Sequence, residues 1–304
     1  MRVLFIFLDG IGLGEHNLET NPFSRARMPT LSKLLDGRSL TKDAAPFHGE
    51  HASLLAVNAG VGVSGLPQSA TGQAILLTGI NIPAELGYHY GPKPNPDVAA
   101  YLKEATLFSR FAKEGKKATL LNAYPPRYFD GIDSGKRLYS SIPLAVVNAG
   151  LPLFRHEDLF AGRALSADFT GEGWRTMLGF AEAPVLSAYE AGRKLAAVAN
   201  EYDFSLFEYW ASDYAGHGQE MDTAVRLMET FDSVLGGLLA LWGDGLILVT
   251  SDHGNMEDLS TRKHTAANVP ALVIGEKTAR DEFTRELKEL TDIAPAIWRT
   301  VMSQ

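Results

Sequence analysis

Leu246-Ile-Leu-Val-Thr-Ser-Asp-His-Gly-Asn-Met-Glu257 is an apolar run that stops abruptly at an acid and a histidine. Its four apolar residues and Thr250 have the length and bounds of a buried strand. At the carboxyl end of such a strand in an α/β sheet, side chains emerge into the crevice where ligands bind. Asp252 and His253 are good ligands for a divalent metal, and Gly254 lets the chain turn sharply behind them. The pair alone fits a capped, hydrogen-bonded loop equally well, so the remainder of the chain decides between the two interpretations.

The amino-terminal stretch repeats the pattern of a buried strand followed by an acid. Residues 3–8 are aromatic and branched, as in a central strand, and Asp9 follows them. Asp9 therefore occupies the position that Asp252 occupies in the other stretch. A lone Asp-Gly is more often a simple turn, so its weight comes from the recurrence.

A third acid and two further histidines complete the pattern. Residues 204–213 alternate like a strand and end in Asp213, and His217 follows four residues later. If the chain turns helically at once, this spacing puts both side chains on one helix face, close enough to hold one ion. His264 precedes another predicted strand, residues 269–274.

A segment rich in Gly, Ser, Pro and Thr offers a hydroxyl group. Residues 74–77 resemble the first turns of a helix, so residues 69–73 lie at its amino-terminal end. Unpaired N–H groups and the helix dipole favour an anion there, and a hydroxyl in that position is ionised cheaply. Ser69 or Thr71 is equally well explained as the N-cap, which is the ordinary role of an isolated Ser-x-Thr-Gly.

Length, charge and cysteine content exclude several classes of protein. With 304 residues the chain can bury a substantial core. Its net charge of −8 argues against a nucleic-acid or anionic-membrane surface, because both require basic patches. It has no cysteine, so any metal is held by oxygen and imidazole nitrogen. We expect a cytoplasmic protein that binds neither nucleic acid nor membrane, since residues 3–8 are too short to span a bilayer.

The intervening segments predict helices, one more strand and a lid. Apolar spacing predicts helices at residues 28–37, 97–113, 188–200, 221–238 and 281–301, with a strand at residues 118–121. The pattern weakens between residues 125 and 185, and we interpret this segment as a lid or small cap. His89, Lys93 and Arg127 lie in loops and are available to a substrate, although His89 fits equally well as an ordinary loop histidine.

Six potential metal ligands are enough for two ions. They are Asp9, Asp213, His217, Asp252, His253 and His264. Ser69 can supply a seventh ligand atom. Two ions a few ångströms apart clamp the attacking and leaving oxygens of an in-line displacement at phosphorus. A serine or threonine ionised by the metal is then the nucleophile, and backbone N–H groups at its turn meet the developing charge.

Five short motifs carry a resemblance to a known family. They are Asp9-Gly10, Ser69-Ala-Thr-Gly-Gln73, Asp213-Tyr-Ala-Gly-His217, Ser251-Asp-His-Gly-Asn-Met-Glu257 and Lys263-His-Thr-x-x-x-Val-Pro270. Their order resembles the signature of the alkaline phosphatase superfamily. The branch most similar is the metalloenzymes that include cofactor-independent phosphoglycerate mutase and phosphopentomutase. The resemblance covers residues up to about 91 and again from 188 to the end, but not the middle.

The resemblance implies a division of the ligands between two metals. One metal is expected on Asp213, His217 and His264. The second is expected on a set that includes the nucleophile, namely Asp9, Ser69, Asp252 and His253. Thr71 is the alternative nucleophile if the register differs. Mn²⁺ is favoured because the resembling mutases use it, and Zn²⁺ is also compatible with carboxylate and imidazole ligands.

The chain departs from the mutases in two ways. Gln73 stands where these mutases usually have a histidine. The mutases also insert a large separate domain that encloses the substrate, and the segment at 125–185 is too short for one. These departures favour release of phosphate to water over return of the phosphoryl group.

We therefore expect one alkaline phosphatase-like domain over residues 1–304, a three-layer α/β/α fold with a mostly parallel central sheet and a small lid. The expected function is two-metal hydrolysis of a small phosphorylated metabolite, a phosphomonoester, through a phosphoserine. The alternatives are a phosphomutase, a phosphodiesterase, and a pseudoenzyme that binds a phosphorylated ligand without turnover. The sequence leaves the identity of the substrate and the oligomeric state open.

Overall fold

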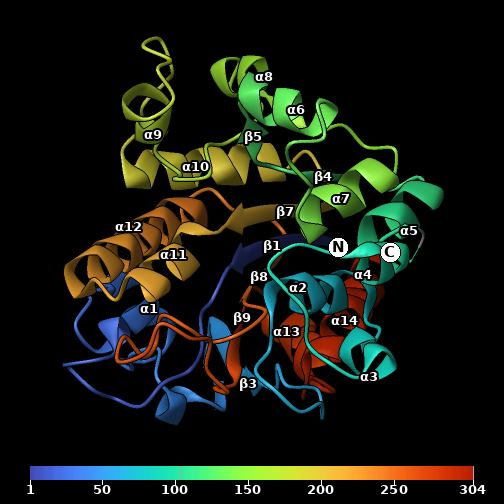
Figure 1. Cartoon of the computed structure of the whole chain (residues 1–304). Coiled ribbons are helices and arrows are strands. Elements are labelled where there is room, and N and C mark those ends of the chain that lie inside the picture. Colours follow the sequence, from blue (N-terminus) through green and yellow to red (C-terminus); the bar gives the residue numbers. More distant parts are fainter. Residues whose placement is uncertain (104, 304) are drawn as a thin grey trace.

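A seven-stranded mixed sheet runs through the middle of the computed structural model, which describes residues 1–103 and 105–303 (Figure 1). The strand order is β2-β3-β9-β8-β1-β7-β4. The strands span Arg2–Leu8 (β1), Phe47–His48 (β2), Ala52–Val57 (β3), Ala118–Leu120 (β4), Phe204–Tyr209 (β7), Gly245–Thr250 (β8) and Val269–Ile274 (β9). Helices cover both faces, so the predicted three-layer α/β/α class is confirmed.

The four strands β8, β1, β7 and β4 are parallel neighbours. In β1 every residue from Val3 to Leu8 is buried, which is the apolar run expected of a central parallel strand. Leu8 pairs with Tyr209, and Phe7 pairs with Thr250. This register brings the chain segments that follow β1, β7 and β8 to one edge of the sheet.

The other half of the sheet is antiparallel. Strand β9 runs antiparallel to β8 and to β3, and β3 runs antiparallel to β2. The amino end of β9 therefore lies at the edge where the carboxyl ends of β1, β7 and β8 meet. His264, which precedes β9, reaches that edge for this reason. Strands β2 and β3 were not predicted from the sequence.

The helices fall into two layers. Their bounds are Pro29–Leu34 (α1), Ser69–Thr78 (α2), Ile82–Leu86 (α3), Pro96–Tyr101 (α4), Leu107–Lys113 (α5), Pro126–Asp133 (α6), Ser141–Asn148 (α7), His156–Phe160 (α8), Glu172–Thr176 (α9), Ala188–Ala199 (α10), Ala211–Gly218 (α11), Met221–Leu239 (α12), Lys277–Thr284 (α13) and Ile293–Met302 (α14), with 3-10 turns at Pro22–Ser24, Lys42–Ala44 and Leu290–Asp292.

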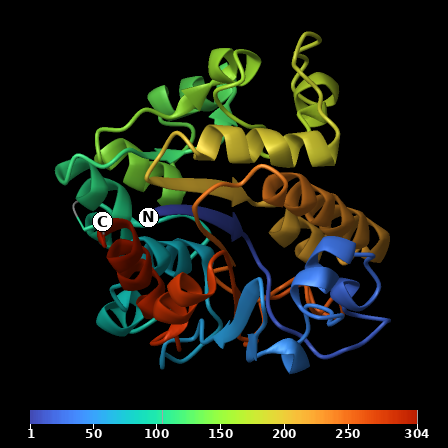
Figure 2. The ribbon, with the colours of Figure 1, turned by 180° about the vertical axis from the view of Figure 1, so that it is seen from behind.

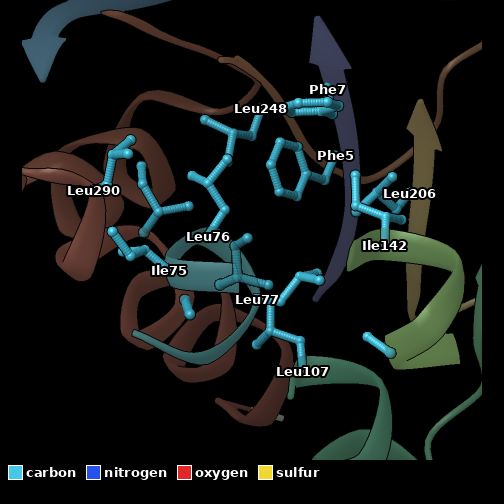
Figure 3. Close-up of a cluster of buried hydrophobic side chains, with 14 of the residues drawn as sticks. Phe5, Phe7, Ile75, Leu76, Leu77, Leu107, Ile142, Leu206, Leu248 and Leu290 are labelled. Carbon is cyan, nitrogen blue, oxygen red and sulfur yellow. The ribbon is translucent and has the colours of Figure 1, made fainter. Parts of the chain in front are cut away.

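Alternate residues of the central strands bury themselves under different helices. Phe5 and Phe7 of β1 pack with Leu76 of α2 and with residues of α5, α7 and α14 (Figure 3). Leu4 and Ile6 point to the other face, where α1, α10 and α12 cover them; these helices are seen from behind in Figure 2. This alternation is the period of two that a strand imposes.

Several predicted elements have different bounds in the structure. The predicted strand at 204–213 ends at Tyr209, and α11 begins at Ala211. The predicted helix at 97–113 is two helices, because the Thr106 side chain accepts a hydrogen bond from Ser109 N and starts α5 anew. The predicted helix at 281–301 is broken by the turn at residues 290–292.

The segment from 125 to 185 contributes to two separate cores. Helices α6, α8 and α9 lie beyond the β4 edge, with the two-stranded sheet of β5 (Ala123–Tyr124) and β6 (Phe154–Arg155) (Figure 1). A small apolar cluster around Trp174 holds part of this segment together. Helix α7 instead packs into the main core through Ile142 and Val146. Its role as a lid stays a prediction.

No helix among residues 1–103 and 105–303 is both long enough and apolar enough to cross a bilayer.

Two glycines let α10 and α12 pack closely. A Cβ atom built on Gly237 lies 1.9 Å from the backbone oxygen of Tyr189, and one built on Gly192 lies 1.9 Å from the backbone oxygen of Val234. Backbone atoms cannot move aside as the end of a side chain can. The close contact of the two helices therefore depends on glycine at both positions.

We expect Gly237→Ala to destabilise the protein by about 1–3 kcal/mol or more, since it overpacks a helix contact. Thermal and urea unfolding measure the effect. Gly236→Ala is the matched control, because its Cβ meets side chains alone, Thr30 Oγ1 at 3.0 Å and the Tyr189 ring at 3.9 Å, and alanine favours the helix by about 1 kcal/mol. Equal stability of the two variants would contradict the packing argument.

Candidate metal centre

The turn after β8 is fixed to the loop after β1 by Ser251. Its hydroxyl accepts a hydrogen bond from Ile11 N at 2.9 Å and donates one to the backbone oxygen of His253 at 3.0 Å. The backbone N–H of Met256 also donates to Gly10 O at 2.9 Å. These bonds hold the two metal-ligand candidates of this turn against the end of β1.

A buried glutamate completes this brace. The Glu257 carboxylate accepts hydrogen bonds from Gly12 N at 2.9 Å, from Asn255 N at 2.7 Å and from the Thr265 hydroxyl. Burial raises the pKa of Glu257, and these hydrogen bonds oppose the rise. Because Thr265 adjoins His264, the same carboxylate also fixes the loop that carries this histidine.

The first cluster of candidate ligands contains Asp213, His217 and His264. Helix α11 begins before Asp213, so the predicted one-face arrangement of Asp213 and His217 is present. His217 Nε2 lies 3.3 Å from Asp213 Oδ2, and His264 Nε2 lies 3.8 Å from Asp213 Oδ1. His217 Nδ1 lies 2.6 Å from Arg262 O, and His264 Nδ1 lies 2.8 Å from Pro67 O. Carbonyl acceptors hold the proton on Nδ1, which leaves each Nε2 free to bind a cation.

The second cluster meets at one nitrogen of His253. Its Nε2 lies 3.5 Å from Asp9 Oδ1, 3.5 Å from Asp252 Oδ2 and 3.0 Å from Ser69 Oγ. Burial lowers the pKa of His253, so its imidazole is neutral near pH 7. A neutral imidazole is the form that binds a metal.

The two clusters form one continuous centre. The rings of His253 and His264 stack with centroids 3.7 Å apart and an interplanar angle of 15°. Ligand atoms of Asp9, Asp213 and His253 all lie within 4.8 Å of one another. Asp213 therefore faces both clusters and can serve both.

The charge of this centre fits divalent cations. Asp9 Oδ1 and Asp252 Oδ2 are buried, and neither has a hydrogen-bond partner in the described part of the chain. Among the described residues, neither Lys nor Arg forms an ion pair with Asp9, Asp213 or Asp252. Burial, followed by the charge of Asp213, raises the pKa of Asp252 to about 8; burial and the neighbouring carboxylates also raise the pKa of Asp9. Unpaired buried carboxylates are costly unless a cation neutralises them, so the residues present fit the metals that the sequence predicts.

The structure distinguishes Ser69 from Thr71. Ser69 is the first residue of α2, and its Oγ faces His253. The Thr71 hydroxyl lies near Gln68 O and accepts a hydrogen bond from Tyr90 N at 3.1 Å. Thr71 thus ties the loop before α4 to α2, and Ser69 remains the predicted nucleophile.

Two glycines bring the parts of the centre into contact. A Cβ on Gly72 of α2 would lie 2.8 Å from Asp252 Cβ. A Cβ on Gly10, whose φ is +68°, would lie 2.6 Å from Asp213 Oδ1. Larger residues at these two positions would push α2 away from Asp252 and the loop after β1 away from Asp213.

Two residues of this centre were missed in the sequence. Asn255 donates from Nδ2 to Asp213 Oδ1 at 2.6 Å and so orients that carboxylate. It lies between His253 and Glu257 in the stretch after β8, so its position next to a candidate ligand could have indicated a role in the centre. Glu208 on β7 is buried, its pKa is raised to about 7 by burial, and it raises the pKa of Asp9. It lies within a predicted strand, where the sequence gives no sign that this glutamate is buried near the metal centre.

The three predicted substrate contacts are placed differently from one another. Lys93 is half-buried in the loop that passes the start of α2. His89 is half-buried, its Nε2 has no hydrogen-bond partner among the described residues, and burial lowers its pKa. Arg127 is exposed on α6. Gln73, the residue that departs from the mutase pattern, is buried with its Oε1 unpartnered.

Comparison with known proteins finds a family match over part of the chain. Residues 168–304, which are less than half of the 304 residues, match the family model of the metalloenzyme superfamily. This carboxyl-terminal part is therefore similar to that superfamily. A 2,3-bisphosphoglycerate-independent phosphoglycerate mutase of Clostridium novyi is 34% identical to this chain over 128 residues, which are 39% of this chain and 25% of the mutase. The match thus spans about a quarter of that relative's length.

Solved structures resemble this chain in fold over its whole length. The PH0037 protein of Pyrococcus horikoshii has a TM-score of 0.56 at 14% identity and covers 100% of this chain and 98% of its own. An alkaline phosphatase from the Antarctic bacterium TAB5 has a TM-score of 0.53 at 14% identity, with 100% and 98% covered. These likenesses show the fold, which is that of alkaline phosphatase.

We expect binding of Mn²⁺ to the metal-free protein at pH 7 to release protons. The raised pKa of Asp252, about 8, keeps a large share of this carboxyl protonated at pH 7, and a metal ligand must be ionised. The apparent affinity therefore increases as the pH rises toward 8. Calorimetry in buffers of different ionisation enthalpy counts the protons.

Asp252→Asn is the control for this measurement, because its amide cannot ionise. It should release fewer protons than the natural protein. Equal proton release in the two proteins would show that Asp252 is already ionised before the metal binds.

Proposed function

We propose that this protein transfers phosphoryl groups through a phosphoserine on Ser69 and hydrolyses a small phosphomonoester. One observation carries the proposal: the Ser69 hydroxyl lies 3.0 Å from His253 Nε2, at the start of α2 and beside unpartnered oxygens of Asp9 and Asp252. A hydroxyl among metal-ligand atoms at a helix N-terminus is suited to attack an anionic ester.

The two clusters are the proposed metal ligands. Asp213, His217 and His264 would hold one divalent cation, and Asp9, Ser69, Asp252 and His253 would hold another. When bound, these ions supply charge that lowers the pKa of the Ser69 hydroxyl and neutralises the phosphoryl oxygens. Mn²⁺ is the proposed ion, with Zn²⁺ as the second choice, because both accept mixed carboxylate and imidazole ligands.

The chain's own residues define two steps. Ser69 Oγ forms a bond to phosphorus while the ester oxygen leaves, and the alcohol takes a proton from solvent. Water then attacks the phosphoserine, phosphate leaves and Ser69 regains its proton. His217 has a side chain that is 44% exposed, so one side of the centre is open to the water that the second step consumes.

A phosphomutase is the second candidate, and the relatives favour it. The relative is a phosphoglycerate mutase. The match to the metalloenzyme family model, over residues 168–304, contains Asp213, His217 and the stretch that ends at Glu257. A mutase must hold the released alcohol beside the phosphoserine until the phosphoryl group returns. The segment at 125–185 is small, which supports hydrolysis as the first candidate.

We expect metal-stripped protein to release no phosphate from a panel of phosphomonoesters, and added Mn²⁺ or Zn²⁺ to restore release. Asp252→Asn should abolish the restored activity. Isomerisation of a sugar or glycerate phosphate without phosphate release would establish the mutase instead. Neither activity with any metal would leave the pseudoenzyme, which binds without turnover.

We expect Ser69→Ala to lower turnover by at least about 10³-fold, as loss of a nucleophile does. Metal content and melting temperature should stay close to those of the natural protein. Thr71→Val is the matched control: it removes a hydroxyl bound to backbone and costs about 1–3 kcal/mol of stability, but turnover stays within a few-fold. Loss of turnover in Thr71→Val alone would assign the nucleophile to Thr71.

A further inference from the structure

A positively charged side chain lies beside an unpartnered phenol in the segment after β5. The Arg137 guanidinium lies 4.6 Å from the centre of the Tyr128 ring. Tyr128 is only 6% exposed, and its hydroxyl has no hydrogen-bond partner among residues 1–103 and 105–303. A buried hydroxyl without a partner costs free energy that a bound acceptor would recover.

A second cation, Lys93, lies close enough to Arg137 for their charges to interact. The loop that carries it crosses the start of α2, because a Cβ built on Gly91 lies 3.2 Å from Ser69 N. Burial, and then the charge of Arg137, lowers the pKa of Lys93. Over residues 1–103 and 105–303, neither Lys93 nor Arg137 forms an ion pair with an acid. Two neighbouring cations without a counter-charge favour binding of an anion.

A chain of contacts connects this place to the metal centre. The Tyr124 and Tyr128 rings are in contact, with centroids 4.4 Å apart and planes tilted by 32°, and the Tyr124 hydroxyl donates to Glu208 Oε2 at 3.3 Å. Glu208 on β7 pairs with Phe7 of β1, two residues before Asp9. Tyr128 is thus linked through β7 to the strand that ends beside Asp9, and the loop that carries Lys93 passes Ser69 at Gly91.

We propose that Lys93, Arg137 and the Tyr128 hydroxyl form a subsite for a second anionic group, a carboxylate or a second phosphate, on the leaving side of the substrate. This inference rests on the proposed function, because it places the phosphoryl group at Ser69. The substrate class is then a phosphomonoester whose alcohol itself bears a negative charge. The protein carries a net charge of −8, so the local pair of cations is not a general feature of its surface.

The donors suit an anion and not a neutral group. An ammonium and a guanidinium donate charge-assisted hydrogen bonds to carboxylate or phosphate oxygens, which are roughly twice as strong as neutral ones. In the proposed function the metal centre and the start of α2 bind the phosphoryl group itself. Lys93 and Arg137 are therefore free to bind the alcohol part of the substrate.

The test is calorimetric binding of phosphonates to the Mn²⁺-loaded protein. The probes are ω-phosphonocarboxylates with one to three methylene groups and the neutral carboxamide of each. We expect at least one carboxylate to bind about tenfold or more tightly than its carboxamide. Arg137→Gln and Tyr128→Phe should each reduce this preference. Tyr128→Phe removes only an unpartnered hydroxyl, so it should fold normally.

Lys136→Gln is the matched control, because Lys136 is an exposed neighbour of Arg137 with the same charge. It should keep the full preference for the carboxylate. Equal binding of carboxylate and carboxamide at every length, or an unchanged preference in Arg137→Gln, would overturn the subsite. Loss of the preference in Lys136→Gln to the same extent would also overturn it, since general surface charge would then explain it.

Hydrolysis of p-nitrophenyl phosphate separates this inference from the proposed function. Its alcohol carries no anionic group, so its hydrolysis does not depend on the subsite. Ser69→Ala should abolish this hydrolysis, while the preference for the phosphonocarboxylate over its carboxamide persists. Absence of hydrolysis with any metal, together with a preserved preference, would reject the hydrolase and support the subsite. Hydrolysis without any preference would reject only the subsite.

Discussion

Mutual repulsion among three carboxylates is the constraint on which the rest of this structure depends. Asp9, Asp213 and Asp252 follow three neighbouring parallel strands and converge in a largely buried space, where no lysine or arginine of the described residues pairs with them. A folded chain keeps such groups together only if something else holds the backbone in place. Divalent cations bound between the carboxylates would neutralise their charge and so remove the free-energy cost of burying them together.

The backbone is held by polar side chains outside the proposed ligand set. Ser251 and Glu257 hold the turn after β8 against the loop after β1, and Asn255 orients the carboxylate of Asp213. Close approach also requires glycine, because a Cβ at Gly72 would meet Asp252. The centre is therefore preorganised by hydrogen bonds and by absent side chains, which is how a site keeps its geometry before its ligand arrives.

The segment from 125 to 185 differs from the sheet in how it is stabilised. Its outer helices have a small apolar cluster of their own, while α7 is anchored in the main core. Such a division holds one end firmly and leaves the other with few apolar contacts, which is typical of regions with low local stability. Arg137 and Tyr128 belong to this segment, so the proposed subsite would place substrate selection outside the central sheet.

The sequence by itself determined the class of fold, the acids at the strand ends and the histidine partner of Asp213, because strand and helix periods are local properties of the chain. Only the tertiary structure decided which residues meet. The antiparallel direction of β9 brings His264 to the metal centre, and hydrogen bonds to the backbone of Tyr90 and Gln68 separate Thr71 from Ser69 as candidate nucleophile. Glu208 looked like an ordinary strand residue. These facts depend on strand order and on contacts between distant residues, which a period of two or of 3.6 does not encode.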